Sequence, residues 1–520
     1  MQHRDRGASD CRRTTEANGH RTVAEGGPVK PVRPNIVWIV LDHLILHSRI
    51  HGSAYPRLST IDRLATEGVE FTRALSVCPI CTPARASMLS GVYPHRHGLL
   101  QNTGAAIGRS DFLPSTPLYN TRLADVGYRC AYFGKWHCGD RLVAADYGFD
   151  GWSDRDYGYP YALREYAEYL NRNQLPDPEV DLEWHYSAAN PVGRVPLRPG
   201  FKGPRAHMAA GVLVSPERTH ETRFVVESAC DWIHEHAAGE DPFCIRVDPW
   251  GPHHPYFVPE ERAGTIDPAT LDPYPSFGHS LADRPRHHRE YRDEIHGSVP
   301  FRGWNEWAWL VARAYEHAEY ADATIGWVID SLDAIGIADQ TVVIVTADHG
   351  DALASNGGLI DKDSMMVEET MRIPLVIRAP DFAEPGSVCA VPVTNMDIVP
   401  TLYRIAGADV DDRCDGTDLL AIASGAAHRD HVMCEHHGHT IDAYQRYIRA
   451  GDLVYVAHNG DSDELYDLAS DPYQLANRID DAAMSSTLVE MQRRLASEMH
   501  QFGDTQSPYA TALLNRLGHR

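Results

Sequence analysis

The sequence predicts an α/β protein, with a large doubly wound, mixed or parallel sheet flanked by helices and a smaller antiparallel sheet near the C-terminus. Two runs, NIVWIVLD (Asn35 to Asp42) and TVVIVTADHGD (Thr341 to Asp351), are apolar and rich in β-branched residues, and each ends in acids. This pattern is typical of strands buried on both faces of a parallel sheet. The segment from Tyr447 to Pro472 instead alternates polar and apolar residues around two Gly-Asp turns, which predicts a small antiparallel sheet.

Three segments between and around these strands have the apolar spacing of helices. They are Thr60 to Glu67, which ends at Gly68, His220 to His236, and Ala308 to Ile335. Strands that alternate with helices indicate a doubly wound sheet. Ligands of such sheets bind just beyond the carboxyl ends of the strands, so we expect the acids that follow the two apolar strands to meet at one site.

The chain divides into three predicted regions. Residues 1–33, rich in Arg, Gly, Thr and Glu, are expected to form a disordered tail, and residues 34–425 the large α/β domain. Within that domain, residues 157–303 are rich in Pro, Arg, His and Tyr, and we interpret them as insertions that carry substrate-facing loops. Residues 426–520 are expected to form a C-terminal subdomain with the small antiparallel sheet and a helix.

The composition restricts the partners of the protein. The chain has 520 residues, 43% of them apolar, and its 48 Lys and Arg against 72 Asp and Glu leave a net charge of −24. That charge disfavours nucleic acid, and an anionic substrate requires a local cluster of positive charge. No window reaches the ~18 apolar residues of a membrane span, and the N-terminus lacks a secretory signal, so we expect a cytoplasmic protein with no membrane partner. The ten cysteines are scattered, which favours free thiols.

The segment Cys81-Thr82-Pro83-Ala84-Arg85 has the features of a helix start. Thr82 suits the N-cap and Pro83 the first helical position, which places Cys81 at the helix mouth, where free amides favour negative charge. Arg85, four residues on, comes round to the same side. Cys78 and Cys81 also form a C-x-x-C pair, which is typical of a redox pair or half a zinc site, but no second pair follows at metal-binding spacing.

With Ala86 to Gly91, this segment resembles the signature of the formylglycine-dependent sulfatases, within the alkaline-phosphatase-like superfamily. The similarity continues, in the order of the family, from Asn35 to Pro472. Its further motifs are Gly134-Lys135-Trp136-His137, Pro252-His253-His254-Pro255-Tyr256, Thr346-Ala347-Asp348-His349-Gly350, Asn395-Met396-Asp397 and Glu464-Leu465-Tyr466-Asp467-Leu468.

The resemblance implies that a separate formylglycine-generating enzyme oxidises Cys81 to Cα-formylglycine. The hydrated form of that residue has two hydroxyls: one attacks sulfur, and the other lets the adduct collapse to the aldehyde and expel sulfate. A serine has only one hydroxyl and could not release sulfate in this way.

The resemblance also assigns roles to further positions. Arg85, Lys135 and Lys362 would supply the local positive charge that an anionic substrate requires. His137 would assist Cys81, and His253 would donate a proton to the leaving oxygen, a role that His254 could exchange with it.

For the metal, the resemblance implies one divalent ion held by Asp42, Asp348, His349 and the formylglycine hydroxyl. His43 is a further candidate ligand, since it stands where many members of the family have a second acid. The alternative is that the strand-end acids only cap neighbouring helices. Oxygen-rich sites suit Ca²⁺, which we expect first, or Mg²⁺, whereas an imidazole ligand shifts the preference toward Mn²⁺ or Zn²⁺.

The sequence thus predicts a sulfatase that hydrolyses the sulfate monoester of a small molecule or saccharide. A phosphonate monoester or phosphodiester hydrolase with the same nucleophile is the nearest alternative, and His43 keeps it open. Two other classes of protein are also alternatives to a sulfatase. One is a non-catalytic binding protein descended from the enzyme, and the other is a thiol oxidoreductase.

Overall fold

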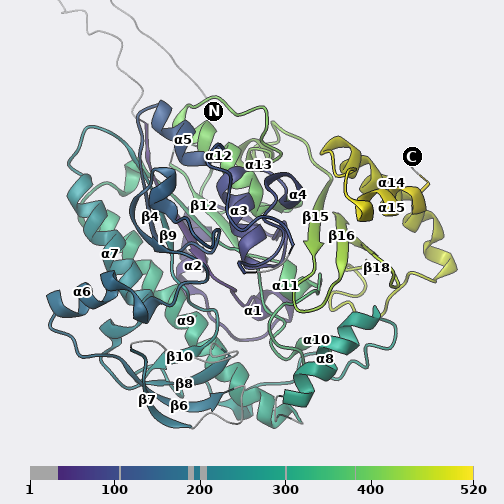
Figure 1. The fold of residues 1–520 in the computed structure, drawn as a ribbon, viewed down its shortest axis with the longest axis horizontal. Helices are drawn as coiled ribbons and strands as arrows, with labels where there is room; N and C mark the ends of the chain where they lie inside the picture. The colour runs from purple at the N-terminus through teal and green to yellow at the C-terminus, as the bar shows by residue number, and fades with distance from the viewer. Residues whose placement is uncertain are drawn as a thin grey trace, which may run out of the picture. The chain divides into compact units, whose positions relative to one another are not determined.

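Eight strands of the computed structural model form a mixed sheet in the order β13-β2-β12-β11-β1-β9-β4-β5 (Figure 1). The structure describes residues 33–104, 107–185, 192–198, 208–298, 301, 303–380 and 382–518. The strands are β1 (Asn35–Leu41), β2 (Val69–Phe71), β4 (Arg129–Lys135), β5 (Asp150–Asp154), β9 (Phe243–Asp248), β11 (Thr341–Ala347), β12 (Leu375–Arg378) and β13 (Ser387–Cys389).

The middle of this sheet is parallel. β11, β1, β9, β4 and β5 run in one direction, whereas β12 is antiparallel to β11 and to β2. The register of β1 and β11 runs from Asn35 opposite Thr341 to Leu41 opposite Ala347, so the two strands end at the same level. Their side chains are almost all buried, as the apolar runs predicted. The mixed sheet predicted from the sequence is confirmed.

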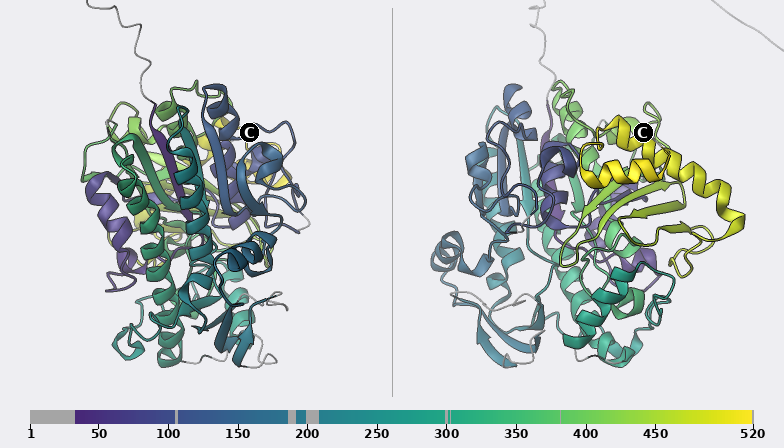
Figure 2. Two further views of the ribbon diagram at one scale, coloured as in Figure 1. Left: turned by 90° about the vertical axis from the view of Figure 1, so that its left-hand side faces the viewer. Right: turned by 45° about the vertical axis from the view of Figure 1, so that its right-hand side comes forward.

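Helices pack on this sheet in two groups (Figures 1 and 2). One group is α2 (Ser59–Glu67), α7 (Glu221–His236) and α9 (Trp304–Ala334), which contact one another through α9. The other group is α3 (Cys81–Ser90), α5 (Tyr119–Asp125) and α12 (Ile398–Ala406). The three helices expected from apolar spacing are confirmed, although α9 begins four residues earlier than predicted.

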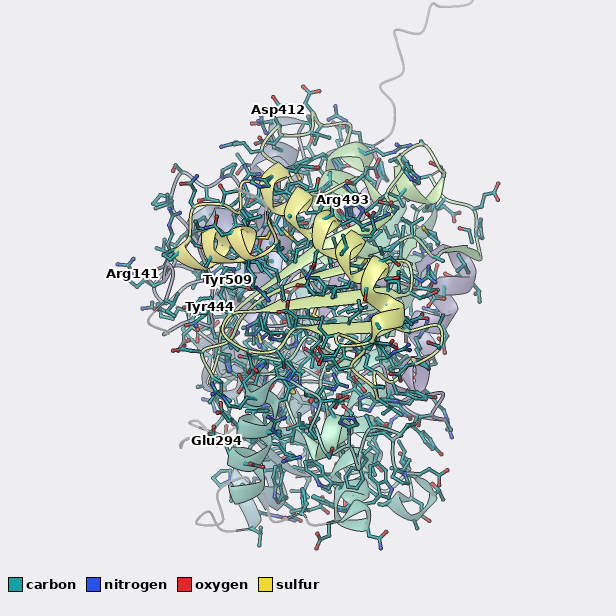
Figure 3. All side chains as sticks on the ribbon, turned by 90° about the vertical axis from the view of Figure 1, so that its right-hand side faces the viewer. Arg141, Glu294, Asp412, Tyr444, Arg493 and Tyr509 are labelled. Carbon is teal, nitrogen blue, oxygen red and sulfur yellow. The ribbon has the colours of Figure 1, made fainter. Side chains whose placement is uncertain are left out.

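A four-stranded antiparallel sheet follows near the C-terminus, as the alternating segment predicted. It comprises β15 (His431–His437), β16 (Tyr444–Ala450), β17 (Leu453–His458) and β18 (Glu464–Asp467). Helices α14 (Ser485–Gln501) and α15 (Pro508–Arg516) cover one of its faces (Figure 2). Figure 3 shows Arg493 on α14, and it shows Tyr444 beside Tyr509, whose ring centroids are 5.7 Å apart.

Residues 157–303 are not made of loops alone. They include α7 and the central strand β9, together with a second sheet in the order β10-β8-β6-β7. Its strands are β6 (Glu179–His185), β7 (Gly193–Pro196), β8 (Ala209–Leu213) and β10 (Tyr256–Pro259), and the helices of this stretch include α6 (Arg164–Arg172) and α8 (Arg286–Ser298).

The remaining short elements connect these layers. They are α1 (His47–Ile50), β3 (Ala74–Leu75), α4 (Pro94–His97), α10 (Ser355–Gly358), α11 (Glu368–Met371), β14 (Val393–Thr394) and α13 (Leu419–Ala423). Among the described residues, none of the helices combines the length and apolar character that a membrane crossing requires. The predicted disordered tail lies outside the described residues except for Arg33 and stays a prediction.

The close approach of β4 to β9 depends on Gly134, and this gives a test of the fold. Gly134 has φ of +112°, and a Cβ there would lie 2.0 Å from the carbonyl oxygen of Asp248. Gly127 has a similar φ of +91°, but a Cβ there would meet nothing within 4 Å. We expect Gly134→Ala to lower the free energy of unfolding by about 2 kcal/mol more than Gly127→Ala, because only the first adds a backbone clash. Equal losses in urea unfolding would contradict this account of the strand packing.

Candidate active site

Four neighbouring parallel strands bring polar side chains to one edge of the main sheet. Asp42 follows β1 and Asp348 follows β11, while Lys135 and Asp248 are the last residues of β4 and β9. All four side chains are buried. The two strand-end acids that the sequence predicted to meet therefore do so, and two further strands contribute to the same place.

Helix α3 begins at Cys81, two residues earlier than the predicted first helical position, Pro83. The N-cap is Ile80, in an extended conformation with φ of −134°, and its carbonyl accepts the first helical hydrogen bond from the amide of Ala84 at 3.0 Å. Thr82 is therefore not the cap; its free amide donates to Oδ1 of Asn102 at 3.1 Å. Pro83 is still tolerated, because amides of the first turn have no partner within the helix. Cys81 keeps its predicted place at the helix mouth.

Arg85 contacts three carboxylates of the site. Its Nε donates to Asp348 Oδ2 and its NH1 to Asp248 Oδ2, both at 2.8 Å, and its NH2 lies 3.4 Å from Asp42 Oδ1. Although burial opposes the charge, Asp348, Asp42 and Asp248 hold the pKa of Arg85 well above its usual value. The charge of Arg85 is therefore already balanced by protein acids.

Four ligand atoms converge where these strands meet α3. Those of Asp42, Cys81, Asp348 and His349 all lie within 4.8 Å of one another, and the four residues are buried. Nδ1 of His349 donates to the carbonyl of Gly350 at 2.9 Å, so its Nε2 presents a lone pair, 3.1 Å from Sγ of Cys81. Such an arrangement is typical of a metal-binding histidine.

The electrostatics of this group also suit a cation. Burial, opposed by Lys135 and reinforced by Asp348, raises the pKa of Asp42 to about 7. Burial would raise the pKa of Asp348 as well, but His349, Arg85 and Lys135 hold it well below its usual value. One Asp42 oxygen, Oδ1, has no hydrogen-bond partner. Two carboxylates, one imidazole and the side chain at position 81 therefore fit a divalent ion.

His43 lies beside this group, with its side chain directed elsewhere. Its backbone amide donates to Asp348 Oδ1 at 2.9 Å, but its ring lies against those of His253 and His254, at 4.6 and 5.5 Å between centroids. Ligand nitrogens of these three histidines lie within 4.8 Å of one another. The structure thus places His43 in a histidine cluster rather than among the four converging ligand atoms.

A cavity of about 270 Å³ opens above the helix mouth. It brings together four of the predicted catalytic residues, Cys81, His137, His253 and Lys362. The rest of its lining is Asn102, Thr103, Asp156, Tyr157, Met208, His254, Tyr291, Asp361, His439 and Thr440. Most of these side chains are polar, so the cavity can offer hydrogen bonds to a hydroxylated ligand.

The two lysines are held by acids. Nζ of Lys362 donates to Asp361 Oδ1 at 2.7 Å, and that of Lys135 is hydrogen bonded to Asp42. Lys135 also lies over the ring of Tyr157, with Nζ 4.3 Å from the centroid. Arg85 and Lys135 are fully buried and are not part of the cavity lining, so Lys362 is the predicted cation that reaches the ligand space.

Several residues of this site are not among the predicted site residues. Asp248 ends the apolar run of β9 in the manner of Asp42, and that signal could have found it. Tyr157 lies on a connecting segment with no sequence signal, yet its hydroxyl is 3.4 Å from Nδ1 of His253. Asn102 likewise acts through a contact that only the fold creates, whereas Asp361 directly precedes Lys362, the lysine that donates to it.

The two cysteines of the C-x-x-C pair lie in different surroundings. Cys78 and Cys81 are both free thiols. Cys78 is buried in an apolar cluster with Val77, Ile80 and Met433, whereas Cys81 faces the cavity. Burial raises the pKa of the Cys78 thiol, which suppresses the thiolate that exchange requires.

The acids at the ends of the parallel strands, with Arg85 between them and Cys81 at the start of α3, form one buried polar site, and the comparisons specify the reaction of the protein. Residues 34–408 match the family model for sulfatase, and residues 356–501 match that for the C-terminal part of N-sulphoglucosamine sulphohydrolase. The protein is a sulfuric ester hydrolase. The chain belongs to the sulfatase family, which confirms the resemblance and the predicted reaction.

Relatives match over most of their length. An ulvan-active sulfatase of Formosa agariphila is 26% identical over 492 residues, which cover 91% of this chain and 83% of that protein. The uncharacterized sulfatase YidJ of Escherichia coli is 28% identical over 503 residues, covering 92% and 90%.

Solved structures share the fold at low sequence identity. One protein, solved in complex with its substrate D-glucosamine-2-N,6-O-disulfate, has a TM-score of 0.68 and 20% identity, covering 91% of this chain and 99% of that one. A phosphonate monoester hydrolase from Silicibacter pomeroyi has a TM-score of 0.70 and 20% identity, covering 90% and 96%. These likenesses establish the fold alone.

Proposed function

We propose that this sulfatase uses Cα-formylglycine, formed from Cys81 by a formylglycine-generating enzyme, as its nucleophile. The observation that carries the proposal is the position of Cys81: it opens α3, faces the cavity, and lies 3.1 Å from Nε2 of His349. In the active enzyme, Sγ of Cys81 stands for a hydroxyl oxygen of the hydrated aldehyde. That group supplies an oxygen nucleophile and, through its second hydroxyl, a way to release sulfate without an attacking water.

We further propose that Asp42, Asp348, His349 and the side chain at position 81 hold one divalent ion. The ion supplies Lewis acidity that lowers the pKa of the nucleophile and polarises a substrate oxygen. Carboxylates dominate the donor set, which supports Ca²⁺, and the imidazole of His349 leaves Mn²⁺ and Mg²⁺ as alternatives. Arg85 fixes the acids in place, because each of its nitrogens faces a carboxylate or carbonyl oxygen.

Among the chain's own residues, Lys362 is the group we assign to a sulfate oxygen, since it lines the cavity and stays charged. Burial opposes that charge, but Asp361 and other nearby negative groups hold the pKa of Lys362 above its usual value. His137 lines the same cavity beside Tyr157, with ring centroids 5.4 Å apart, and remains our proposal for the residue that assists position 81.

Protonation of the leaving oxygen by His253 stays a prediction, and the structure sets a condition on it. Nδ1 of His253 lies 2.5 Å from the carbonyl oxygen of His254, which can only accept, so Nδ1 carries the proton. Burial, together with Coulombic repulsion from His254 and Lys135, lowers the pKa of His253 well below its usual value. The ring is therefore neutral, with a lone pair on Nε2, and it can donate from Nε2 only after taking up a proton there.

We propose a sulfated saccharide as the substrate. The polar cavity lining supports it, including Asn102, Thr103, His439 and Thr440. The structurally similar protein solved with a glucosamine disulfate also supports it. The cytoplasmic location predicted from the sequence stays a prediction.

The choice between sulfate and phosphorus esters can be tested with one aryl group carried as sulfate, phosphate monoester, phosphodiester and phosphonate monoester. We expect the sulfate to give the highest kcat/KM, because a diester or phosphonate must fit a second substituent where a sulfate has a bare oxygen. If a diester or phosphonate exceeds the sulfate by more than ~100-fold, about 2.7 kcal/mol of transition-state discrimination, a phosphorus ester replaces the sulfated saccharide that we propose as the preferred substrate.

A further inference from the structure

We propose that His43, His253 and His254 form a second metal site, for a borderline divalent cation of which Zn²⁺ is the best match. This site lies beside the group of Asp42, Asp348, His349 and position 81, and it shares no ligand with that group. The inference goes beyond the proposed function, because it depends neither on the modification of Cys81 nor on the ester that is hydrolysed.

The three rings form a compact buried cluster. The centroid of His43 lies 4.6 Å from that of His253, and His253 lies 4.1 Å from His254. Their exposed fractions are 1%, 7% and 2%, respectively, and a ligand nitrogen of each lies within 4.8 Å of the others. Three imidazoles gathered in this way are a ligand set that suits zinc, copper, iron or nickel rather than calcium.

The nitrogens of His43 are the first reason to place an ion here. Nδ1 of this buried ring has no hydrogen-bond partner, and Nε2 makes no hydrogen bond although two carboxylate oxygens lie 3.3 and 3.5 Å from it. A buried polar atom left unpaired costs about 1–3 kcal/mol, so such groups call for a partner. His43 also has a φ of +63°, a left-handed conformation that few residues adopt and that directs its side chain away from the run of β1.

The tautomer of His253 is the second reason. Its Nδ1 proton goes to the carbonyl of His254, which leaves the Nε2 lone pair available to a cation. His349 in the neighbouring group has the same arrangement, with Nδ1 donating to the carbonyl of Gly350. Metal-binding histidines usually donate their other ring N–H to a carbonyl or carboxylate in this way.

Two carboxylates also lie next to His43, at the spacing expected between two ligands of one metal ion. Nε2 of His43 lies 3.3 Å from Asp351 Oδ2 and 3.5 Å from Asp361 Oδ1. Two ligand atoms that are each about 2.0–2.1 Å from a tetrahedral Zn²⁺ are about 3.4 Å apart, so both spacings match edges of a zinc coordination sphere. Asp351 accepts from the Tyr256 hydroxyl at 3.0 Å and Asp361 from Lys362 at 2.7 Å, which orients both carboxylates.

Occupation of this site has a consequence for catalysis. An ion bound to Nε2 of His253 excludes protonation at the same atom, so metal binding and leaving-group protonation by His253 are mutually exclusive. A cation held by the three histidines would instead lie next to the proposed ion site of Asp42, Asp348 and His349. The rings of His43 and His349 are 4.8 Å apart. Two adjacent cations can stabilise both the attacking and the leaving oxygen of a displacement.

The test counts zinc in the purified full-length protein. The protein is stripped with a chelator, equilibrated with ZnCl₂, desalted, and assayed for zinc per chain by mass spectrometry. We expect about two ions in the unaltered chain and about one in His43→Gln and in His254→Gln. Asp348→Asn should lose the other ion and keep this one, and His439→Gln, which alters a cavity histidine outside the cluster, should keep both.

Co²⁺ gives a second readout, because its visible absorption bands report ligand type and geometry without any turnover. We expect an absorption component that Asp348→Asn retains and that His43→Gln and His254→Gln lose. Unfolding curves identify any variant that fails to fold. If one of the two histidine variants does not fold, the metal content of the other one tests the proposal.

The proposal is overturned if the unaltered chain holds a single ion that only Asp348→Asn removes. It is also overturned if neither histidine variant lowers the zinc content, which would make the cluster a hydrogen-bonded network without an ion. Protein that binds the second ion and is fully active with Cys81 as an unmodified thiol would refute the proposed function and leave this site intact.

Discussion

We expect Cys81→Ala to abolish hydrolysis of a sulfate ester while leaving the fold intact. We expect kcat/KM to fall by at least ~10⁴-fold, because the substitution removes the nucleophile that every turnover needs. The side chain lies in the first turn of α3 and alanine is the best helix former, so the free energy of unfolding should change by no more than ~1 kcal/mol. Steady-state kinetics and urea unfolding on the same preparation check both parts.

Cys78→Ala is the matched control for this experiment. Cys78 is a buried cysteine three residues earlier, and it packs in an apolar cluster that does not face the cavity. We expect this variant to lose some stability and to keep its kcat/KM. Loss of activity in both variants would point to a role for the C-x-x-C pair, and residual turnover in Cys81→Ala above a few per cent would remove Cys81 as the nucleophile.

Asp348→Asn should reduce metal content and activity together, with kcat/KM lower by ~10³-fold. Asp348 accepts from Arg85 through one oxygen and from the amides of His43 and His349 through the other. Asparagine keeps the size of the side chain but removes its charge and one acceptor, so a divalent ion loses both attraction and a ligand. Elemental analysis and kinetics on matched samples make the measurement.

Asp322→Asn is the matched control for Asp348→Asn, because Asp322 caps a helix and is not among the proposed metal ligands. Asp322 is a buried acid whose oxygens accept from the amides of Thr60 and Ile61 at the start of α2, at 2.8 and 3.1 Å. We expect this variant to lose stability, by about 1 kcal/mol, with metal content and kcat/KM unchanged. A full metal complement in active Asp348→Asn protein would show that Asp348 is only a structural acid.

Much of the fold could be predicted because local pattern and tertiary position agree. The apolar runs of β1 and β11 are buried on both faces, and the alternating segment near the C-terminus forms β16, β17 and β18. Cys81 could be placed at a helix mouth because Pro83 and the following residues favour a helix start. The cap itself was misassigned, since Ile80 takes that position through its backbone conformation alone.

The directions of charged side chains could not be predicted in the same way. Arg85 was expected to meet the substrate, yet three carboxylates from three different strand ends surround it. Its buried charge requires such partners, and their positions depend on strand order, which the sequence does not state. His43 follows Asp42 directly, but its left-handed backbone sends the ring toward His253 and Asp351.

The most direct test of formylglycine catalysis is the mass of the tryptic peptide from Ala74 to Arg85, measured in preparations of different specific activity. Co-expression with different amounts of a formylglycine-generating enzyme would provide preparations that differ in the modified fraction of position 81. We predict that position 81 carries oxygen in place of sulfur, as formylglycine or its hydrate, and that kcat rises in proportion to the modified fraction. Full activity in a preparation whose Cys81 is an unmodified thiol would contradict the account.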